Sequence, residues 1–524
     1  MTDNIQAKPG DKFIRRPRVK AHPLKRVLGI PGLYSAGYGN VGSSIYYALG
    51  VIALAAMGAT PVVLAIAGIF FIFTALTYAE GTALLPEAGG SASFARHGFN
   101  DMIGFISGWA LMLSYVVTIA ISAYTIPPYL GLFWAPLKDS AVVGTVTSMG
   151  IIFFLMIVNV IGLKETSIIN ILATLMDLFV QVLIIVLGLI FIFNIKNLSF
   201  NITNFWPSID KLFLGIALAA IAYTGVETMS QMAEETKQPA KKVPKALILM
   251  VITVLLLFGG VATVGFSAMS PTELASTWST DPVAGIAYHI TQAITPGEMA
   301  QSISSEEEIV IVLTWIFNGV QRALPILVAV LAASILLIAT NAGLIGISRL
   351  AFSLGRYQLI PPQLSRVHHR SKTPFIAIIL FSLAAIIILI PSLFAREGFL
   401  RLGTLYAFGS LLSFIFAHAS VLSLRIKNPE WHRPFKLGWN IQFRGRELPI
   451  TAILGLVGTS VIWIVVIITQ PYSRWVGLAW IAIGLIIYLI FRSIKRLPVI
   501  GIAKPPTTIK VQDYFQSMGK KLNH

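Results

Sequence analysis

The chain has 524 residues, of which 56% are hydrophobic and only 12% are charged. Soluble globular proteins carry about a quarter charged residues, so the composition indicates a chain that lies mostly in lipid. The absence of cysteine excludes disulfides and thiolate metal sites, and we expect no cofactor. The net charge of +17 does not indicate a nucleic-acid partner, because the basic residues lie in short loops between apolar runs.

Apolar runs that are long enough to cross a lipid bilayer follow one another along the chain. Residues 27–79 contain no Asp, Glu, Lys or Arg, and Gly58-Ala59-Thr60-Pro61 would divide them into two spans. The pattern predicts an all-α polytopic membrane protein of about twelve transmembrane helices. These lie near 31–57, 61–85, 102–131, 140–162, 166–194, 211–234, 244–269, 323–349, 374–394, 401–424, 448–470 and 474–492.

The distribution of basic residues predicts the orientation of these spans. Most of the 39 Lys and Arg residues fall in the segments on the same side as the N-terminus, and such segments face the cytoplasm. We therefore expect a multi-pass protein of the cell (plasma) membrane with both termini in the cytoplasm. The long outer segment 270–322 is acidic and contains three prolines, which favours an ordered extracellular cover with short helices.

The first span contains a glycine-rich interruption, Gly37-Tyr38-Gly39-Asn40-Val41-Gly42-Ser43-Ser44. Glycine costs about 1 kcal/mol in a helix interior, so three glycines within six residues predict local unwinding. Unwound backbone inside a bilayer must line a cavity or be buried in protein. The backbone N–H groups of Gly42, Ser43 and Ser44 would then form an anion site at the start of a half-helix. The same residues match G-x-G-x-x-G, but a dinucleotide site needs a preceding strand, which this apolar run does not offer.

The sixth span contains a second interruption, Ala222-Tyr223-Thr224-Gly225-Val226-Glu227. Spans one and six hold corresponding positions in two five-helix halves. A matched pair of glycine-interrupted spans is typical of a transporter site between inverted repeats. The alternative is that these glycines only allow helices to pack closely.

Besides Glu234 at the end of span six, three carboxylic acids lie within the predicted spans, where ionisable groups are costly and usually functional. Asp177 has Gln181 one turn later on the same helix face, and it could bind a proton or ligate a cation. The alternative is a neutral acid that is hydrogen-bonded to a neighbouring helix. We interpret Glu227 and Glu80 as salt-bridge or hinge groups rather than ion carriers. Because the chain has no H-E-x-x-H, phosphate-loop or G-x-S-x-G motif, we expect no enzyme activity.

Six short motifs, in order along most of the chain, resemble the amino acid–polyamine–organocation (APC) superfamily, and in particular its amino acid permeases. The first is the glycine-rich first span, and Tyr223 to Glu227 in the sixth span is another. The others are Tyr78-Ala79-Glu80-Gly81 with 85–92, Gly162 to Ser167, Ala233 to Pro239 with 243–246, and Asn341 to Arg349 with 355–374.

The resemblance implies a 5+5 inverted-repeat fold of the leucine-transporter type with broken helices 1 and 6. It implies a basic tail at 1–30, repeats at 31–194 and 211–424, two further helices at 448–492 and a cytoplasmic tail at 493–524. It also implies where an amino acid would bind. Its carboxylate would meet the amides of Gly42, Ser43 and Ser44, and its ammonium group would meet carbonyls near Asn40 and Tyr223. Other substrate-binding residues expected from spans one, three and six are Tyr47, Tyr115, Thr224 and Gly225, with Tyr223 as a candidate gate.

Two departures from the family limit this transfer. Some proton-coupled members have a lysine where this chain has Asp177, so the lysine mechanism cannot be carried over. We hypothesise instead that Asp177 and Ser334 of span eight form the ion-coupling site. A potassium-importing branch has acids where this chain has Asn40 and Ser114, which argues against a bare potassium site.

The sequence therefore predicts a secondary active transporter that imports amino acids, coupled to protons or to another cation. An inorganic cation importer of the potassium type and the same fold is the main alternative. Polyamine transport is a further alternative, but it would favour more acids at the breaks than Glu227 alone. A sensor would need a sizeable soluble output domain, and the predicted C-terminal tail is short.

Overall fold

The computed structural model describes residues 26–162, 167–304, 307–366, 373–394 and 398–502. Most of the predicted N-terminal tail, residues 163–166 of the Gly162 to Ser167 motif, and residues 503–524 lie outside the described residues. Helices make up nearly all of the regular structure, and one two-stranded antiparallel sheet is the exception among the described residues.

The described residues up to 204 form nine α-helices. These are α1 (Ile30–Val41), α2 (Ile45–Ala56), α3 (Thr60–Leu84), α4 (Ser91–Gly98), α5 (Asp101–Leu130), α6 (Pro136–Asp139), α7 (Ala141–Ile161), α8 (Ser167–Phe191) and α9 (Ile195–Asn204).

The rest of the described chain forms eleven α-helices and two strands, besides short 3-10 turns. These are α10 (Ile209–Ala219), α11 (Val226–Gln231), α12 (Pro239–Ala268), α13 (Pro271–Ser276), α14 (Pro282–Ala293), α15 (Pro296–Ile303), α16 (Glu307–Arg356), α17 (Phe375–Leu389), α18 (Gly398–Lys427), β1 (Asn440–Phe443), β2 (Arg446–Pro449), α19 (Ile450–Thr469) and α20 (Pro471–Ile494).

Eleven stretches of the described chain are long and apolar enough to cross a membrane. The first stretch, Ile30–Leu84, covers the two spans predicted at 31–57 and 61–85. A 3-10 turn at Met57–Ala59 separates α2 from α3 inside it, at the place where Gly58 to Pro61 predicts a division. The predicted outer segment 270–322 is helical over much of its length, and α16 begins inside it at Glu307 rather than near residue 323.

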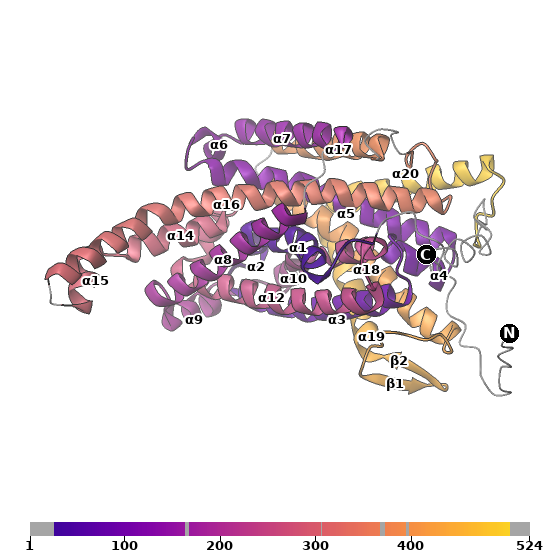
Figure 1. Cartoon of the computed structure of the whole chain (residues 1–524), viewed down its shortest axis with the longest axis horizontal. Coiled ribbons are helices and arrows are strands. Elements are labelled where there is room, and N and C mark those ends of the chain that lie inside the picture. The colour runs from indigo at the N-terminus through magenta and orange to yellow at the C-terminus, as the bar shows by residue number, and fades with distance from the viewer. Residues whose placement is uncertain (1–25, 163–166, 305–306, 367–372, 395–397, 503–524) are drawn as a thin grey trace, which may run out of the picture.

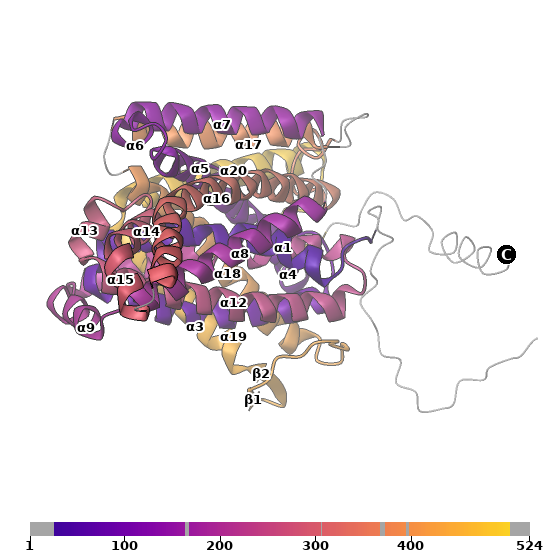
Figure 2. The same ribbon diagram turned by 60° about the vertical axis from the view of Figure 1, so that its left-hand side comes forward.

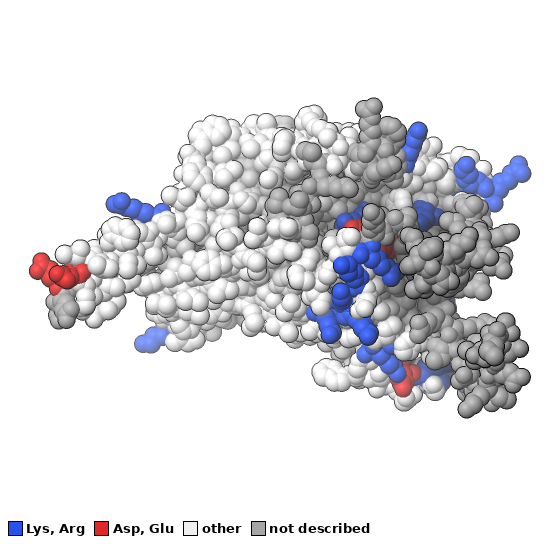
Figure 3. Space-filling model, in the orientation of Figure 1, with Lys and Arg blue, Asp and Glu red and all other residues white. Residues whose placement is uncertain are grey.

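The long helices run side by side along one axis of the molecule (Figure 1). α5 and α18 are enclosed by other helices, whereas α7, α19 and α20 are largely exposed. The exposed helices carry large apolar side chains on their outer faces, such as Phe153 and Phe154 of α7. A helix that is apolar all round and still exposed is a membrane helix. The flank of the bundle is accordingly almost free of charge, and Lys and Arg gather at one end (Figure 3).

The segment after α12 closes one end of the bundle. It lies so close to α2 that a Cβ atom on Gly50 would collide with the carbonyl oxygen of Ser279. Lys138 of α6 fixes this segment through an ion pair with Asp281, with Nζ 2.6 Å from Oδ2. Burial raises the pKa of Asp281, and the neighbouring Lys138 opposes that rise.

Tyr129 of α5 connects the same segment to the core of the bundle. Its hydroxyl accepts a hydrogen bond from the Val283 N–H at 3.3 Å. It also donates one to the carbonyl oxygen of Tyr46 at 2.6 Å. The rings of Tyr46 and Tyr129 meet edge to face, with their centroids 5.6 Å apart. One tyrosine pair therefore joins the outer segment to α2.

Ion pairs tie the opposite end together. The end of span six, Glu234 and Glu235, pairs with Arg356 and Arg349 of α16 at 2.8 and 2.9 Å. Backbone hydrogen bonds join the chain just before α1 to the same segment, as the N–H of Lys237 donates to the carbonyl oxygen of Leu28. These contacts hold the ends of spans one, six and eight close together.

Candidate substrate and coupling site

The sixth span is broken where the sequence predicts it. α10 ends at Ala219, a 3-10 turn follows at 220–223, and α11 begins at Val226. Between them Thr224 is extended and Gly225 has φ +123°, a conformation that a residue with a side chain rarely adopts. The buried carboxylate of Glu227 accepts the Gly225 N–H at 3.0 Å and stabilises this turn. The break therefore depends on Gly225, which adopts the positive φ, and on Glu227, which accepts its N–H.

The first span is not unwound in the way that its glycines predict. α1 continues directly into a 3-10 turn at Gly42–Ser44 and then into α2. Gly42 keeps helical dihedral angles, and its N–H donates to the carbonyl oxygen of Tyr38. The expectation of a freed Gly42 amide is therefore wrong for this conformation. Glycine permits unwinding but does not force it, and the ring of Tyr38 lies where a Cβ atom of Gly42 would be.

The two interrupted spans meet through polar side chains. The Nδ2 atom of Asn40 donates to Oγ1 of Thr228 at 3.0 Å. The hydroxyl of Tyr115, from α5, donates to Oε1 of Gln231 at 3.0 Å and lies 3.5 Å from Oγ1 of Thr228. All four side chains are buried. Spans one, three and six thus share one hydrogen-bonded cluster, which we call the central polar cluster.

Two atoms of the central polar cluster have no hydrogen-bond partner among the described residues. They are Oδ1 of Asn40, which is an acceptor, and Nε2 of Gln231, which is a donor. Buried polar atoms are hydrogen-bonded in the great majority of cases, so each exception needs an explanation. A buried zwitterion would need an acceptor for its ammonium group and a donor for its carboxylate, and these two atoms lie close to the break in span six.

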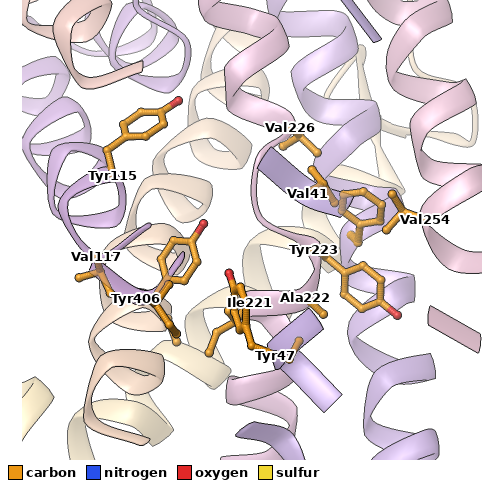
Figure 4. Close-up of a cluster of buried hydrophobic side chains, with 14 of the residues drawn as sticks. Val41, Tyr47, Tyr115, Val117, Ile221, Ala222, Tyr223, Val226, Val254 and Tyr406 are labelled. Atoms are coloured by element: carbon orange, nitrogen blue, oxygen red, sulfur yellow. The ribbon is translucent and has the colours of Figure 1, made fainter. Parts of the chain in front are cut away.

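Tyrosines surround the break in span six (Figure 4). Oγ1 of Thr224 lies 2.6 Å from the hydroxyl of Tyr406 on α18. The hydroxyl of Tyr47 lies 3.2 Å from Oγ of Ser44, and the Ser43 hydroxyl donates to the Asn40 carbonyl oxygen at 3.0 Å. Tyr47, Ser43, Ser44 and Thr224 are therefore all buried near the two interruptions, as the sequence predicts.

Tyr223 does not take part in this arrangement. Its side chain points away from Tyr47, Tyr115 and Tyr406 (Figure 4). Its hydroxyl donates to the Leu64 carbonyl oxygen at 3.0 Å, and its ring stacks on Phe71. The expectation that Tyr223 faces the substrate as a gate is wrong in this conformation, because the side chain packs against α3 instead. Tyr223 instead borders a mostly apolar pocket between α3, α18 and α19, which offers no charged group for an amino acid.

Asp177 of α8 lies beside the 3-10 turn at Gly42–Ser44 in span one. Its Oδ1 accepts the Tyr46 hydroxyl at 2.7 Å, and its Oδ2 accepts the Tyr38 hydroxyl at 2.9 Å and Nε2 of Gln181 at 2.7 Å. Tyr38 precedes the 3-10 turn and Tyr46 follows it. The carboxylate therefore links the two halves of span one across the interruption.

The predicted pairing of Asp177 with Ser334 is wrong. Ser334 is exposed on α16, and its hydroxyl donates to the Val330 carbonyl oxygen of its own helix at 2.7 Å. A serine that bonds to its own helix backbone in this way is satisfied in an apolar environment without another partner. The side chains that replace it at Asp177 are tyrosines from α1 and α2.

Glu80 lies apart from both groups. Its carboxylate receives two hydrogen bonds of 2.6 Å from Arg425 of α18 and one of 2.8 Å from the Leu437 N–H. Arg433 lies 3.3 Å away. These contacts fit the salt-bridge role that the sequence suggests and join α3, α18 and the segment before β1.

Sequence reasoning missed five residues of this region: Thr228, Gln231, Tyr406, Tyr38 and Tyr46. Thr228 and Gln231 follow Gly225 by three and six residues on one helix face, so the polar spacing could have identified them. No comparable indication in the sequence marked the three tyrosines, because an aromatic residue in an apolar span is usually part of the hydrophobic core.

A family model described as amino acid permease matches residues 28–491 of the chain. The chain belongs to this family. The permease is therefore a multi-pass membrane transporter and not an enzyme.

Curated relatives of the permease are transporters as well. It is 25% identical to the branched-chain amino acid permease BcaP of Bacillus subtilis, over 89% of this chain and 93% of the relative. It is 26% identical to the methylthioribose transporter of B. subtilis, over 90% and 94%. It is also 26% identical to the chloroplastic cationic amino acid transporter 7 of Arabidopsis thaliana, over 76% and 66%. These relatives differ in their named substrates, and none of the three is named for an inorganic cation.

Proposed function

We propose that the permease imports amino acids across the plasma membrane by alternating access, coupled to the movement of protons. The observation that carries the proposal is the pair of buried, unpartnered polar atoms between the interrupted spans, Oδ1 of Asn40 and Nε2 of Gln231. The family description and the names of BcaP and cationic amino acid transporter 7 support an amino acid as the substrate.

The central polar cluster has the chemistry to bind both charged ends of an amino acid. Oδ1 of Asn40 can accept hydrogen bonds from the ammonium group, and Nε2 of Gln231 can donate to the carboxylate. Hydrogen bonds to charged groups are stronger than neutral ones. Gly225 brings the backbone close, because a Cβ atom there would lie 2.6 Å from Val41 and 3.2 Å from Nδ2 of Asn40. The hydroxyls of Ser43 and Ser44 supply further polar groups beside Asn40.

The surroundings of Asp177 favour a proton over a metal cation as the coupling ion. The groups that face the carboxylate are two tyrosine hydroxyls and one amide N–H, and all three direct hydrogens at it. A bound sodium or calcium ion would need oxygen lone pairs at those positions. A proton needs only that one tyrosine hydroxyl reverses from donor to acceptor. Loading the proton would therefore change the contacts on one side of the 3-10 turn at Gly42–Ser44.

The two interrupted spans fit two five-helix repeats at 31–194 and 211–424. Spans one, two, six and seven would rock against spans three, four, eight and nine around the central polar cluster. The ion pairs of Glu234 and Glu235 with α16 would close the pathway at one end. The Lys138–Asp281 pair would close it at the other. The concentration of basic residues at the first end supports cytoplasmic termini.

Uptake of labelled amino acids into liposomes that contain the full chain tests the proposal. A mixture of amino acids is supplied with and without an inward proton gradient, and a rubidium tracer is measured in parallel. We expect an amino acid to accumulate only with the gradient. Rubidium uptake without any amino acid uptake would refute the proposed substrate class.

A pair of matched variants tests the binding site separately. Gln231→Leu removes the donor from the central polar cluster. Gln321→Leu makes the same change on α16, where the side chain donates to the carbonyl oxygens of Thr291 at 3.0 Å and Ile294 at 3.5 Å, away from the central polar cluster. Losing a hydrogen bond to a charged group costs about 1.5–3 kcal/mol, so KM should rise by about 10- to 150-fold in the first variant only. Equal KM values would exclude Gln231 from the site.

A further inference from the structure

The β1–β2 hairpin lies at the side of the helix bundle, beyond α19 (Figures 1 and 2). β2 packs beside the ends of α18 and α19. By contrast, all four residues of β1 are exposed. The hairpin connects the end of α18 at Lys427 to the start of α19 at Ile450, so it leaves the bundle at the level where these two helices emerge from the membrane. A segment at the side of the bundle at this level lies along the bilayer surface.

The exposed strand carries large apolar side chains. Trp439, just before β1, is 77% exposed, and Ile441 and Phe443 of β1 are 42% and 55% exposed. Side chains two residues apart point to the same side of a strand, so Ile441 and Phe443 form one apolar side and Asn440 and Gln442 form the other. Tryptophan and phenylalanine are typical of segments that insert into the headgroup region of a bilayer.

The turn of the hairpin contains an arginine in a backbone conformation that is unfavourable for this residue. Arg444 and Gly445 connect the strands with φ +50° and +73°, the pattern of a two-residue turn that favours Asn-Gly or Asp-Gly. Arginine in the first position is less favourable than these residues, because its Cβ crowds the backbone at positive φ. Its guanidinium carbon lies 5.5 Å from the Phe443 ring centroid. The turn therefore keeps a cation next to the apolar side chains.

Further positive charge surrounds this turn. Arg446 is exposed at the start of β2, and Lys436 pairs with Glu447, which is the acid of the hairpin. The bundle end on which the hairpin lies is also where Lys and Arg gather on the face seen in Figure 3. Clustered basic residues at a membrane surface attract anionic lipids. The positive charge of the hairpin is therefore complementary to an anionic lipid surface.

We propose that the β1–β2 hairpin is a membrane anchor that inserts Trp439, Ile441 and Phe443 into the headgroup region, with Arg444 and Arg446 binding anionic lipid headgroups. The anchor would hold the ends of α18 and α19 at a fixed depth. Its partner is the bilayer itself, and it acts independently of the substrate that the permease carries.

The absence of cysteine from the chain makes this proposal directly testable. Single cysteines replace Ile441 or Phe443 on the apolar side and, as matched controls, Asn440 or Gln442 on the other side. Each full-length variant receives a nitroxide spin label in liposomes of phosphatidylcholine, alone or with phosphatidylglycerol. Collision with dissolved oxygen reports contact with lipid, and collision with a water-soluble nickel chelate reports contact with water.

We expect the labels at 441 and 443 to favour oxygen and the labels at 440 and 442 to favour the nickel chelate. The difference should grow when phosphatidylglycerol is present. Arg444→Asn together with Arg446→Gln, of which the first keeps a residue suited to the turn, should return the difference to its value in phosphatidylcholine alone. Equal nickel access at all four positions would overturn the anchor and indicate a surface for a soluble partner. Equal immersion in the two lipid mixtures would overturn the role of the arginines.

Discussion

Replacing Asp177 with asparagine changes the charge of the proposed coupling site while keeping its shape. The carboxylate accepts hydrogen bonds from Tyr38, Tyr46 and Gln181. An asparagine whose carbonyl oxygen takes the place of Oδ2 keeps the bonds from Tyr38 and Gln181. Its amide N–H group then faces the Tyr46 hydroxyl, which can rotate to accept. The Asp177→Asn side chain therefore imitates the protonated acid permanently, and we expect the variant to fold.

The size of the effect follows from the energy in the gradient. A gradient of about two pH units supplies about 2.7 kcal/mol for each proton transferred. With one proton for each amino acid and no membrane potential, the substrate can accumulate about 100-fold. A site that no longer releases a proton cannot use this energy. In Asp177→Asn the internal substrate concentration should therefore only reach about the external concentration. Exchange of internal for external substrate needs no proton and should continue.

The assay compares net uptake and exchange in the same liposomes, with the membrane potential clamped. Asp210→Asn serves as the matched control, because Asp210 is exposed at the start of α10 and should not affect accumulation. Gradient-driven accumulation by Asp177→Asn at the level of the unaltered protein would refute the coupling role of Asp177. Loss of both accumulation and exchange would show instead that Asp177 is needed for the structure of the site.

Three further predictions concern the site and its supports. Gly225→Ala should abolish transport and lower thermal stability, because φ is +123° and the new Cβ would lie 2.6 Å from a neighbouring side chain, whereas Gly150→Ala, with open space around it, should do neither. Tyr115→Phe should raise KM by about 5- to 10-fold through loss of a hydrogen bond of about 1 kcal/mol, and Tyr223→Phe should leave KM unchanged; uptake kinetics that show the reverse would place the wrong tyrosine in the site. Burial alone would raise the pKa of Glu87, but hydrogen bonds that include those from His97 and Ser93 lower it overall, so its stabilising effect should be complete near neutral pH and diminish below about pH 4.3. Glu87→Gln should therefore lower the melting temperature at pH 7 and lower it less as the pH falls below about 4, and a pH-independent difference would contradict this reasoning.

The positions of the spans could be predicted because a membrane helix needs a long apolar run and little else. The break in span six could also be predicted, since the left-handed conformation of Gly225 needs a glycine. The three glycines of span one, by contrast, wrongly suggested an unwound backbone. They allow unwinding, but packing against Tyr38 keeps Gly42 helical in this conformation. The start of α16 at Glu307 was missed because Arg322 interrupts the apolar pattern, although residues 309–317 before it are largely apolar.

The partners of buried side chains depend on tertiary contacts that a sequence does not contain. Asp177 was identifiable as a lone acid in an apolar helix, whereas its partners Tyr38 and Tyr46 come from another part of the chain. No sequence signal placed Ser334 beside Asp177, and in the structure Ser334 bonds to its own helix instead. Tyr223 was placed on the correct span, but its contacts with Leu64 and Phe71 of α3 show that it points away from the central polar cluster.

The Tyr46–Tyr129 pair has a thermodynamic consequence for the outer segment. Tyr129 binds the Val283 N–H of that segment, and Tyr46 binds both Tyr129, through its backbone, and Asp177, through its hydroxyl. If reversal of the Tyr46 hydroxyl alters the docking of the outer segment, docking must alter the proton affinity of Asp177 by the same factor, because linkage between two equilibria is reciprocal. A ligand that holds the outer segment in place, such as an antibody fragment, would then shift the pH at which transport is half-maximal without touching the substrate.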